Sequence, residues 1–132
     1  MMKILLAYDG SGPAKRALET AADIAKGTAA TLTVLTVLPA SEGMPSADAG
    51  APALHSGSLE EARMLLESRL PACHFLESTG DAATAIERLA SEGEFDLVVL
   101  GSRGLGTIAR VLLGSTSEHV ATHAQTSVLI VR

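Results

Sequence analysis

The sequence is poor in aromatic and basic residues, and both shortages limit what its surface can bind. Its 132 residues include no Trp, one Tyr and two Phe, although 47% of them are hydrophobic. The core must therefore be built from Ala, Val, Leu and Ile, and surfaces that stack on bases are not expected. Lys and Arg number 10 against 15 Asp and Glu, for a net charge of −5. Because a nucleic-acid binder needs a basic face to neutralise phosphates, we expect no nucleic-acid partner.

Cysteine and long apolar runs are equally scarce. The single cysteine, Cys73, excludes an intramolecular disulfide and a cysteine-based metal cluster, and fits a reducing compartment. No apolar run approaches the roughly 20 residues that span a bilayer. The first run, Ile4 to Tyr8, is too short for the hydrophobic region of a signal peptide. We therefore expect a cytoplasmic protein without a membrane-spanning segment.

Short apolar runs alternate along the chain with longer segments of helical period. This pattern is typical of an α/β protein with a parallel sheet flanked by helices, and 132 residues suffice for one domain. The third strand is placed because a parallel sheet needs a strand between two successive helices. The predicted strands are residues 3–8, 30–38, 73–78, 96–100 and 127–131, and the predicted helices are residues 13–27, 58–70, 82–92 and 115–123.

The segment 40–57 is rich in Ser, Gly, Pro and Ala and has few large apolar side chains. Such a composition predicts a mobile loop. Directly after it, Ser58 and Glu61 have the spacing of a capping box, in which a serine and a glutamate satisfy the first N–H groups of a helix. The second helix is therefore predicted to begin at Ser58.

A glycine-rich segment follows the fourth predicted strand. Gly101 and Gly104 lie at its start, and nine residues separate Gly104 from Gly114 and Ser115, which open the last helix. In open parallel sheets ligands bind at the carboxyl ends of the strands, where glycines let backbone N–H groups approach a phosphate. The N–H groups of a helix N-terminus also attract anions. The segment therefore predicts a phosphate-binding site.

A purely structural interpretation of the same residues stays open. Ser115 and Glu118 also have capping-box spacing, so Ser115 could serve only to cap its helix. The glycines could serve only to form turns. Likewise Asp9, after the first strand, could bind a ribose or a Mg²⁺ ion, or could only cap the first helix or shape the turn before it.

Together these motifs resemble the universal stress protein family, over essentially the whole chain. The resemblance rests on Asp-Gly-Ser after the first strand, the sequence Asp-Leu-Val-Val-Leu-Gly-Ser-Arg-Gly at 96–104, the Gly-x2-Gly-x9-Gly-Ser spacing and the closing apolar strand. The spacing is that of the nucleotide-binding branch of the family. The resemblance implies a Rossmann-like sheet of five strands in the order 3-2-1-4-5, with helices on both faces. It also implies bound ATP or AMP, with Mg²⁺, and a homodimer formed through the last strand, Ser127 to Val131.

The resemblance also assigns nucleotide-binding residues. Asp9 matches the acidic residue near the sugar and phosphates, and Val37 matches the residue whose backbone holds the adenine. Tyr8 stands where the family often has a small residue, so its ring could crowd the ribose, stack on the ligand or point away. The full predicted set is Ala7, Tyr8, Asp9, Val37, Gly101, Ser102, Arg103, Gly104, Gly114, Ser115, Thr116 and Ser117.

No further catalytic or metal-binding group is predicted. His119 and His123 are four residues apart on a helix, but the sequence near them supplies no Cys, Asp or third His to complete a metal site. Without an assigned base or nucleophile, the sequence favours a nucleotide-binding regulatory dimer with at most slow ATP hydrolysis. The alternatives are a dimeric scaffold without a ligand, and a Mg²⁺-dependent nucleotide hydrolase or phosphotransferase that uses Asp9. An apolar last strand would be covered by its copy in a second subunit.

Overall fold

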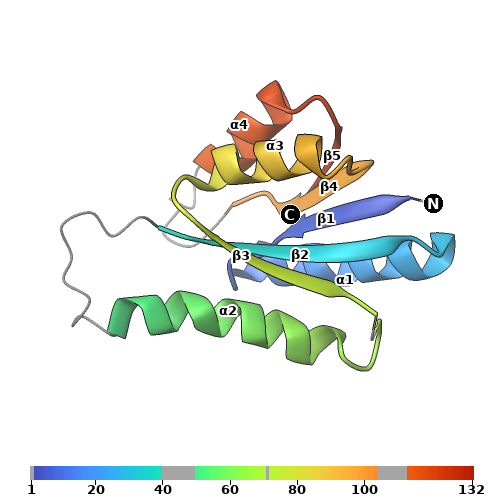
Figure 1. The fold of residues 1–132 in the computed structure, drawn as a ribbon, viewed down its shortest axis with the longest axis horizontal. Coiled ribbons are helices and arrows are strands. Elements are labelled where there is room, and N and C mark those ends of the chain that lie inside the picture. The colour runs from blue at the N-terminus through green and yellow to red at the C-terminus, as the bar shows by residue number, and fades with distance from the viewer. Residues whose placement is uncertain (1, 40–49, 71, 104–112) are drawn as a thin grey trace.

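A computed structural model describes residues 2–39, 50–70, 72–103 and 113–132, with the side chains of 50–56 left aside. It confirms a parallel sheet of five strands in the predicted order, β3-β2-β1-β4-β5. Four helices connect the strands within the described residues (Figure 1). The elements are β1 (Lys3–Ala7), α1 (Gly12–Thr28), β2 (Thr31–Leu38), α2 (Gly50–Leu66), β3 (His74–Thr79), α3 (Ala82–Glu92), β4 (Leu97–Gly101), α4 (Ser115–His123) and β5 (Ser127–Val131).

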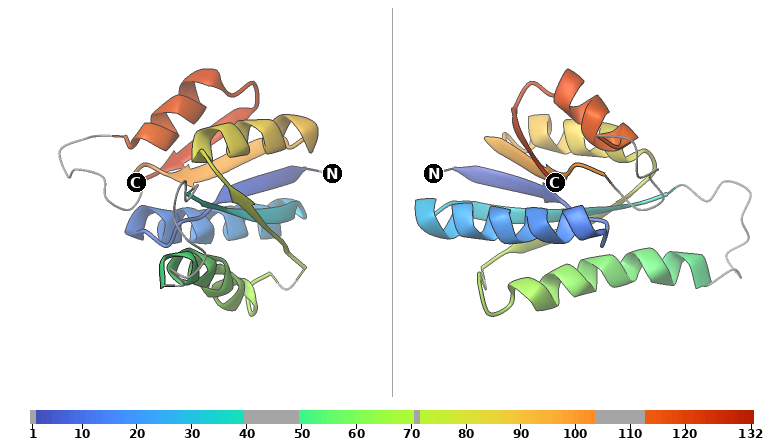
Figure 2. Two further views of the ribbon diagram at one scale, coloured as in Figure 1. Left: turned by 60° about the vertical axis from the view of Figure 1, so that its left-hand side comes forward. Right: turned by 180° about the vertical axis from the view of Figure 1, so that it is seen from behind.

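The helices form a layer on each side of the sheet. Helices α1 and α2 cover one face and α3 and α4 cover the other, as the views in Figures 1 and 2 agree. The central strand β1 is apolar after its first residue, Lys3: Ile4 and Leu6 pack toward α1, whereas Leu5 packs toward α3 and α4. Because successive side chains of a strand point to opposite faces, the buried middle of a strand covered on both faces is mostly apolar on both sides.

The prediction for the second helix is wrong at its start. Helix α2 begins at Gly50, not at Ser58, and ends at Leu66 rather than near residue 70. The Ser58 hydroxyl donates to the Asp9 carbonyl at 3.3 Å, so it makes a tertiary contact instead of capping a helix. The capping-box spacing was therefore misleading, because a serine within a helix can satisfy its hydroxyl elsewhere. The predicted loop at 40–57 is wrong for residues 50–57, which belong to α2. Its residues 40–49 lie outside the described residues.

The third strand is confirmed one residue later than predicted. Cys73 lies just before β3 and is half-buried, and its Sγ contacts the Leu70 carbonyl at 2.9 Å. Burial raises the pKa of the Cys73 thiol, so the thiolate is disfavoured. The residue therefore has the surroundings of a structural cysteine rather than of an activated thiol.

The order of the strands reverses between β1 and β4. The chain runs outward from β1 through β2 to β3, then returns to place β4 on the other side of β1 (Figure 1). Such a reversal leaves a crevice at the carboxyl ends of the two strands, which is where open α/β sheets bind ligands. In the part of the chain that the structure describes, no helix is long and apolar enough to cross a membrane.

Candidate functional site

The carboxyl end of β1 turns into α1 through a tight, hydrogen-bonded loop. The Asp9 carboxylate accepts the backbone N–H of Ser11 at 2.9 Å, and Gly10 has a φ of +85°, which favours glycine. Ser11 is the N-cap of α1, and its hydroxyl accepts the N–H of Ala14 at 3.2 Å. Asp9 therefore shapes the turn, as the structural interpretation held, and Ser11 rather than Asp9 caps the helix.

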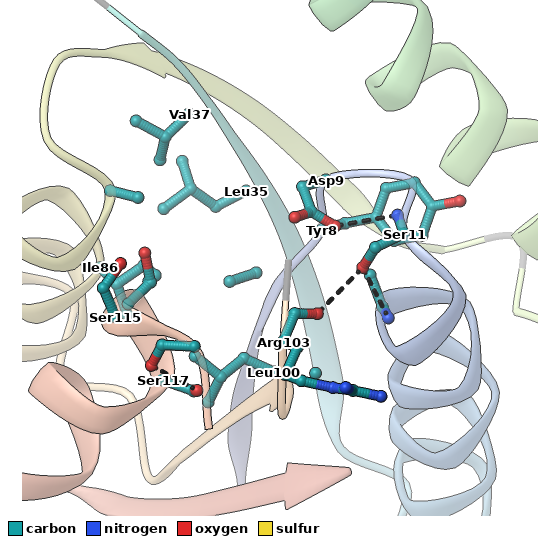
Figure 3. Close-up of a pocket in the computed structure, with 16 residues that line it drawn as sticks. Tyr8, Asp9, Ser11, Leu35, Val37, Ile86, Leu100, Arg103, Ser115 and Ser117 are labelled. Atoms are coloured by element: carbon teal, nitrogen blue, oxygen red, sulfur yellow. Dashed lines mark hydrogen bonds between the residues drawn. The ribbon is translucent and has the colours of Figure 1, made fainter. Parts of the chain in front are cut away.

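Tyr8 points away from the crevice. Its ring is buried among residues of α1 and α2, and its hydroxyl donates to the Glu61 carboxylate of α2. Burial first, and then this hydrogen bond, raise the pKa of Tyr8 well above its ordinary value. In Figure 3 the ring lies on the far side of the strand from Leu35 and Val37. Of the three orientations considered for Tyr8, the structure shows the third, so its ring leaves the crevice open.

Gly101, the last residue of β4, allows α1 to approach the sheet closely. A Cβ atom at this position would lie 2.8 Å from the backbone nitrogen of Ala14 and 2.8 Å from the carbonyl carbon of Pro13. Real Cβ contacts are essentially never that short. The glycine is therefore needed for packing, whatever its role toward a ligand.

Ser102 ties three elements together behind the crevice. Its N–H donates to the Val131 carbonyl of β5 at 2.7 Å, and its own carbonyl accepts the Gly114 N–H at 2.6 Å and the Ser117 hydroxyl at 2.6 Å. The residue is only 2% exposed. These bonds hold the first turn of α4 against the end of β4, so the N-terminus of α4 has a fixed position at the crevice.

The N-terminus of α4 is not capped by a side chain. Gly114 is the N-cap and makes no side-chain hydrogen bond, and Ser115 is already the first helical residue. The capping-box interpretation of Ser115 and Glu118 is therefore wrong, because a capping serine must stand one position earlier. The first N–H groups of a helix have no acceptor within the helix and carry its partial positive charge.

These elements enclose one cavity of about 180 Å³ (Figure 3). Its floor comes from residues that are in register on three neighbouring strands, since Ala7 pairs with both Leu35 and Leu100. An apolar cavity of about 150 Å³ holds a benzene molecule, so this one has room for a planar ring. The lining residues are Ala7, Tyr8, Asp9, Ser11, Ala14, Leu35, Val37, Ala82, Ile86, Leu100, Gly101, Arg103, Gly114, Ser115, Thr116 and Ser117.

The cavity has an apolar and a polar side. Leu35 and Val37 from β2 lie with Ile86 from α3 at one side in Figure 3, and Asp9 and Ser11 lie at another. The side chain of Arg103 extends toward α1 rather than toward Val37. The arrangement can take a ligand that combines an apolar ring with hydroxyl or anionic groups.

The structure brings ten of the twelve predicted site residues together around this cavity. Ser102 is excluded from the lining because it is buried behind the site. Gly104 lies outside the described residues. The predicted residues that line the cavity are Ala7, Tyr8, Asp9, Val37, Gly101, Arg103, Gly114, Ser115, Thr116 and Ser117.

Several lining residues were missed by the sequence analysis. Leu35 could have been found, because it lies two residues before Val37 and so faces the same side of β2. Ser11 belongs to the Asp-Gly-Ser motif but was not assigned to the site. Ala82 and Ile86 come from α3, which is brought over the crevice by the return of the chain from β3, and no local signal in the sequence indicates this.

Comparison with known proteins assigns the whole chain to one family. The family model described as the universal stress protein family matches residues 1–132. The chain belongs to the universal stress protein family. A universal stress protein of Thermus aquaticus is 36% identical over 133 residues, which cover 98% of this chain and 97% of that protein.

Solved structures of universal stress proteins resemble this chain over nearly its whole length. UspA from Lactobacillus plantarum superposes with a TM-score of 0.81 at 30% identity, covering 99% of this chain and 97% of the other. A universal stress protein in complex with cAMP superposes with a TM-score of 0.77 at 30% identity, with the same coverage of both chains. The resemblance inferred from the motifs is thus confirmed at the level of family and fold.

Proposed function

We propose that this universal stress protein is a regulatory protein that binds an adenine nucleotide, ATP or AMP, in the cavity between β1 and β4. One observation carries the proposal: the N-terminus of α4 and an apolar side formed by β2 and α3 line the same cavity. An adenine nucleotide combines an apolar ring with a sugar and an anion. The cavity offers a partner for each of these parts.

The proposed pose follows from the chemistry of the lining. The adenine lies against Leu35, Val37 and Ile86, with its edge toward the backbone of β2. The phosphates lie at the first turn of α4, where the N–H groups of Ser115 and Thr116 point outward from the helix end. The Asp9 carboxylate is placed at the end of β1 to accept ribose hydroxyls or to hold a Mg²⁺ ion bound to the phosphates.

A related structure supports this class of ligand. The universal stress protein solved with cAMP shares 30% identity and nearly the whole fold with this chain. Its ligand is an adenine nucleotide with a single phosphate. The common part of cAMP, AMP and ATP is the adenosine with one phosphate, which is also the part that the described cavity residues can contact.

The site favours retention of the nucleotide over its turnover. Among the residues that line the cavity the carboxylate is that of Asp9, and it already accepts the Ser11 N–H at 2.9 Å and shapes a turn. A hydrolase would need a positioned base for the attacking water. We therefore propose at most slow ATP hydrolysis, with nucleotide occupancy as the regulatory signal. The ligand-free scaffold is less well supported, since Tyr8 does not block the cavity.

We further propose that the protein forms a homodimer through β5. This strand is one edge of the sheet, and four of its five residues, Val128 to Val131, are partly buried, although among the described strands only β4 pairs with it. An apolar edge strand with unpaired backbone groups favours pairing with a second copy. Antiparallel pairing of β5 with its copy would cover it in a closed dimer.

A charge placed at the α4 N-terminus tests nucleotide binding without threatening the fold. Ser115→Asp adds a negative charge at the first position of α4, which stabilises a free helix by about 0.3–1 kcal/mol. The same charge repels the phosphates and should weaken AMP and Mg²⁺-ATP binding by about tenfold or more. Ser115→Asn is the matched neutral control. Binding is measured by isothermal titration calorimetry on protein freed of any co-purified nucleotide.

The result distinguishes the proposal from its alternatives. We expect Ser115→Asp to melt at or above the temperature of the wild type while losing affinity, and Ser115→Asn to keep most of it. Equal affinity in all three proteins would place the phosphates elsewhere. No nucleotide binding by the wild type would favour the scaffold.

A further inference from the structure

A cluster of metal-binding side chains lies on the surface between α3 and α4. Glu87 of α3 and the two histidines His119 and His123 of α4 each offer one ligand atom, and these atoms lie within 4.8 Å of one another. The sequence near the histidines contains no Cys, Asp or third His that could complete the site. The fold supplies one from 32 residues away, because α3 and α4 pack side by side on the same face of the sheet (Figure 1).

We propose that Glu87, His119 and His123 form a binding site for a divalent transition-metal ion, with Zn²⁺ as the ion that suits them best. Two imidazoles and one carboxylate are a common set of protein ligands for zinc, with a water molecule in the fourth position. The site is separate from the proposed nucleotide site and does not depend on it.

The hydrogen bonds of the two rings indicate which ring nitrogen of each histidine carries the proton. The Nδ1 atom of His119 lies 2.7 Å from the Glu87 carboxylate, and the Nδ1 atom of His123 lies 3.0 Å from the His119 carbonyl. Both partners can only accept, so each neutral ring carries its proton on Nδ1 and has its lone pair on Nε2. His123 thus already donates its other N–H to a carbonyl, as histidines that bind metals usually do. Glu87 would give up its hydrogen bond to His119 when it binds the ion, because a carboxylate on the Nδ1 side of a ring cannot also bind an ion on the Nε2 side.

The spacing of the cluster is close to that of a zinc site. The rings stack with centroids 4.1 Å apart and an angle of 23° between their planes. Ligand atoms of a tetrahedral zinc at about 2.1 Å from the ion are about 3.4 Å apart. The ligand atoms lie within 4.8 Å of one another, so they need to approach by at most about 1.4 Å, which side-chain rotations can supply. All three can do so, since His123 is exposed and the side chains of His119 and Glu87 are 48% and 24% exposed.

The histidines are spaced to bind one ion together. Residues four apart on a helix lie one above the other on the same face. Glu87 then adds a ligand from a second helix, so the ion would join α3 to α4. Ile86 and Ser117, close in sequence to these ligands, line the cavity, so the ion would stabilise the two helices that flank it.

Zinc titration of the purified chain tests the site. The protein is used without a histidine tag, freed of nucleotide and metal, and in a Cys73→Ser background so that the thiol beside His74 cannot bind zinc. We expect one Zn²⁺ ion per chain by isothermal titration calorimetry. At a free zinc concentration about 100 times the dissociation constant, the melting midpoint should rise by about 10 °C. Mg²⁺ should cause no rise, because it prefers oxygen ligands.

Single substitutions locate the ion. His119→Ala, His123→Ala and Glu87→Gln should each weaken zinc binding by about tenfold or more. Glu87→Gln keeps an acceptor for the His119 ring, so its metal-free melting temperature shows whether the fold is intact. His74→Ala, at the exposed histidine of β3, is the matched control and should leave the affinity unchanged.

Three outcomes would overturn the proposal. Zinc binding could be absent, it could survive in both His123→Ala and Glu87→Gln, or it could be lost equally in His74→Ala. In each case the contact between Glu87 and His119 would serve only as a hydrogen bond that joins α3 to α4. None of these results would bear on nucleotide binding, because the residues of the two sites are different.

Discussion

Adding a single methyl group at Gly101 should measurably destabilise the protein. In Gly101→Ala the new Cβ atom would lie 2.8 Å from backbone atoms of both Pro13 and Ala14, whereas ordinary contacts begin at 3.4 Å. The first turn of α1 would have to move away from β4 by about 0.6 Å, the difference between these two distances. Backbone atoms cannot avoid the contact by a change of rotamer, and Ser11 caps this turn at the same place.

The expected magnitude follows from overpacking. Extra methyl groups in well-packed regions cost about 1–3 kcal/mol, partly offset by the gain of about 0.5–1 kcal/mol on replacing glycine with alanine in a regular element. We expect a net loss of about 1–2 kcal/mol in the free energy of unfolding. For a domain of this size the melting midpoint should fall by about 4–7 °C. Urea unfolding monitored by circular dichroism measures the free energy directly.

A second glycine provides a control for which the expected change in stability has the opposite sign. Gly27 lies in α1, and a Cβ atom there would meet nothing within 4 Å. Gly27→Ala should therefore stabilise the protein by up to about 1 kcal/mol, through helix propensity alone. If Gly101→Ala were as stable as the wild type, the close approach of α1 to the end of β4 would be wrong. The structural explanation of this glycine would then be lost, and a role in ligand binding would remain.

Two further predictions concern the hydroxyl of Tyr8 and the edge strand β5. Tyr8 is the only tyrosine of the chain, so the near-ultraviolet absorbance of tyrosinate reports on it alone. Burial and Glu61 raise the pKa of Tyr8 above the ordinary tyrosine value of 10.0, so at alkaline pH the folded protein holds a proton that the unfolded chain releases. This contribution to stability should be complete below pH 10.0 and decrease as the pH rises above that value. Alkaline titration should show tyrosinate appearing above pH 10.0 in the folded protein and nearer that pH in Glu61→Gln, and equal midpoints in the two proteins would refute the assigned cause. For the dimer, Leu129→Lys in β5 should shift the mass measured by sedimentation toward that of a monomer, whereas Leu76→Lys, at a 43% exposed leucine on the opposite edge strand, should leave it unchanged. Circular dichroism must show that both variants are folded, and an unchanged mass in a folded Leu129→Lys would place the interface elsewhere.

Much of the fold could be predicted because its signals are local. The run at 97–100 is apolar at every position, as is typical of a strand covered on both faces, and Gly93 and Gly114 cap the neighbouring helices α3 and α4. The site could be located for a related reason. In a parallel sheet the carboxyl ends of all strands lie at one edge, so Asp9 after β1 and Gly101 at the end of β4 had to lie near each other once β1 and β4 were neighbours.

The predictions that failed concern side chains with more than one available partner. Ser58 and Ser115 both have the spacing of a capping box, but the Ser58 hydroxyl bonds to Asp9 and Ser115 stands one position too late to cap. A serine hydroxyl gains similar free energy from any acceptor within reach. Which acceptor is nearest depends on how elements pack, and this is not encoded in local spacing.

The amino-acid sequence alone therefore determined the strands, most helix positions and the edge of the sheet at which the cavity lies, because hydrophobic period and glycine placement act over a few residues. Only the tertiary structure decided where individual side chains point. It turned the ring of Tyr8 toward α2, placed Ser102 behind the cavity, and brought Glu87 to His119 across 32 residues of sequence. These contacts join distant segments, and their partners become neighbours only after the sheet has ordered its strands and the helices have packed on its two faces.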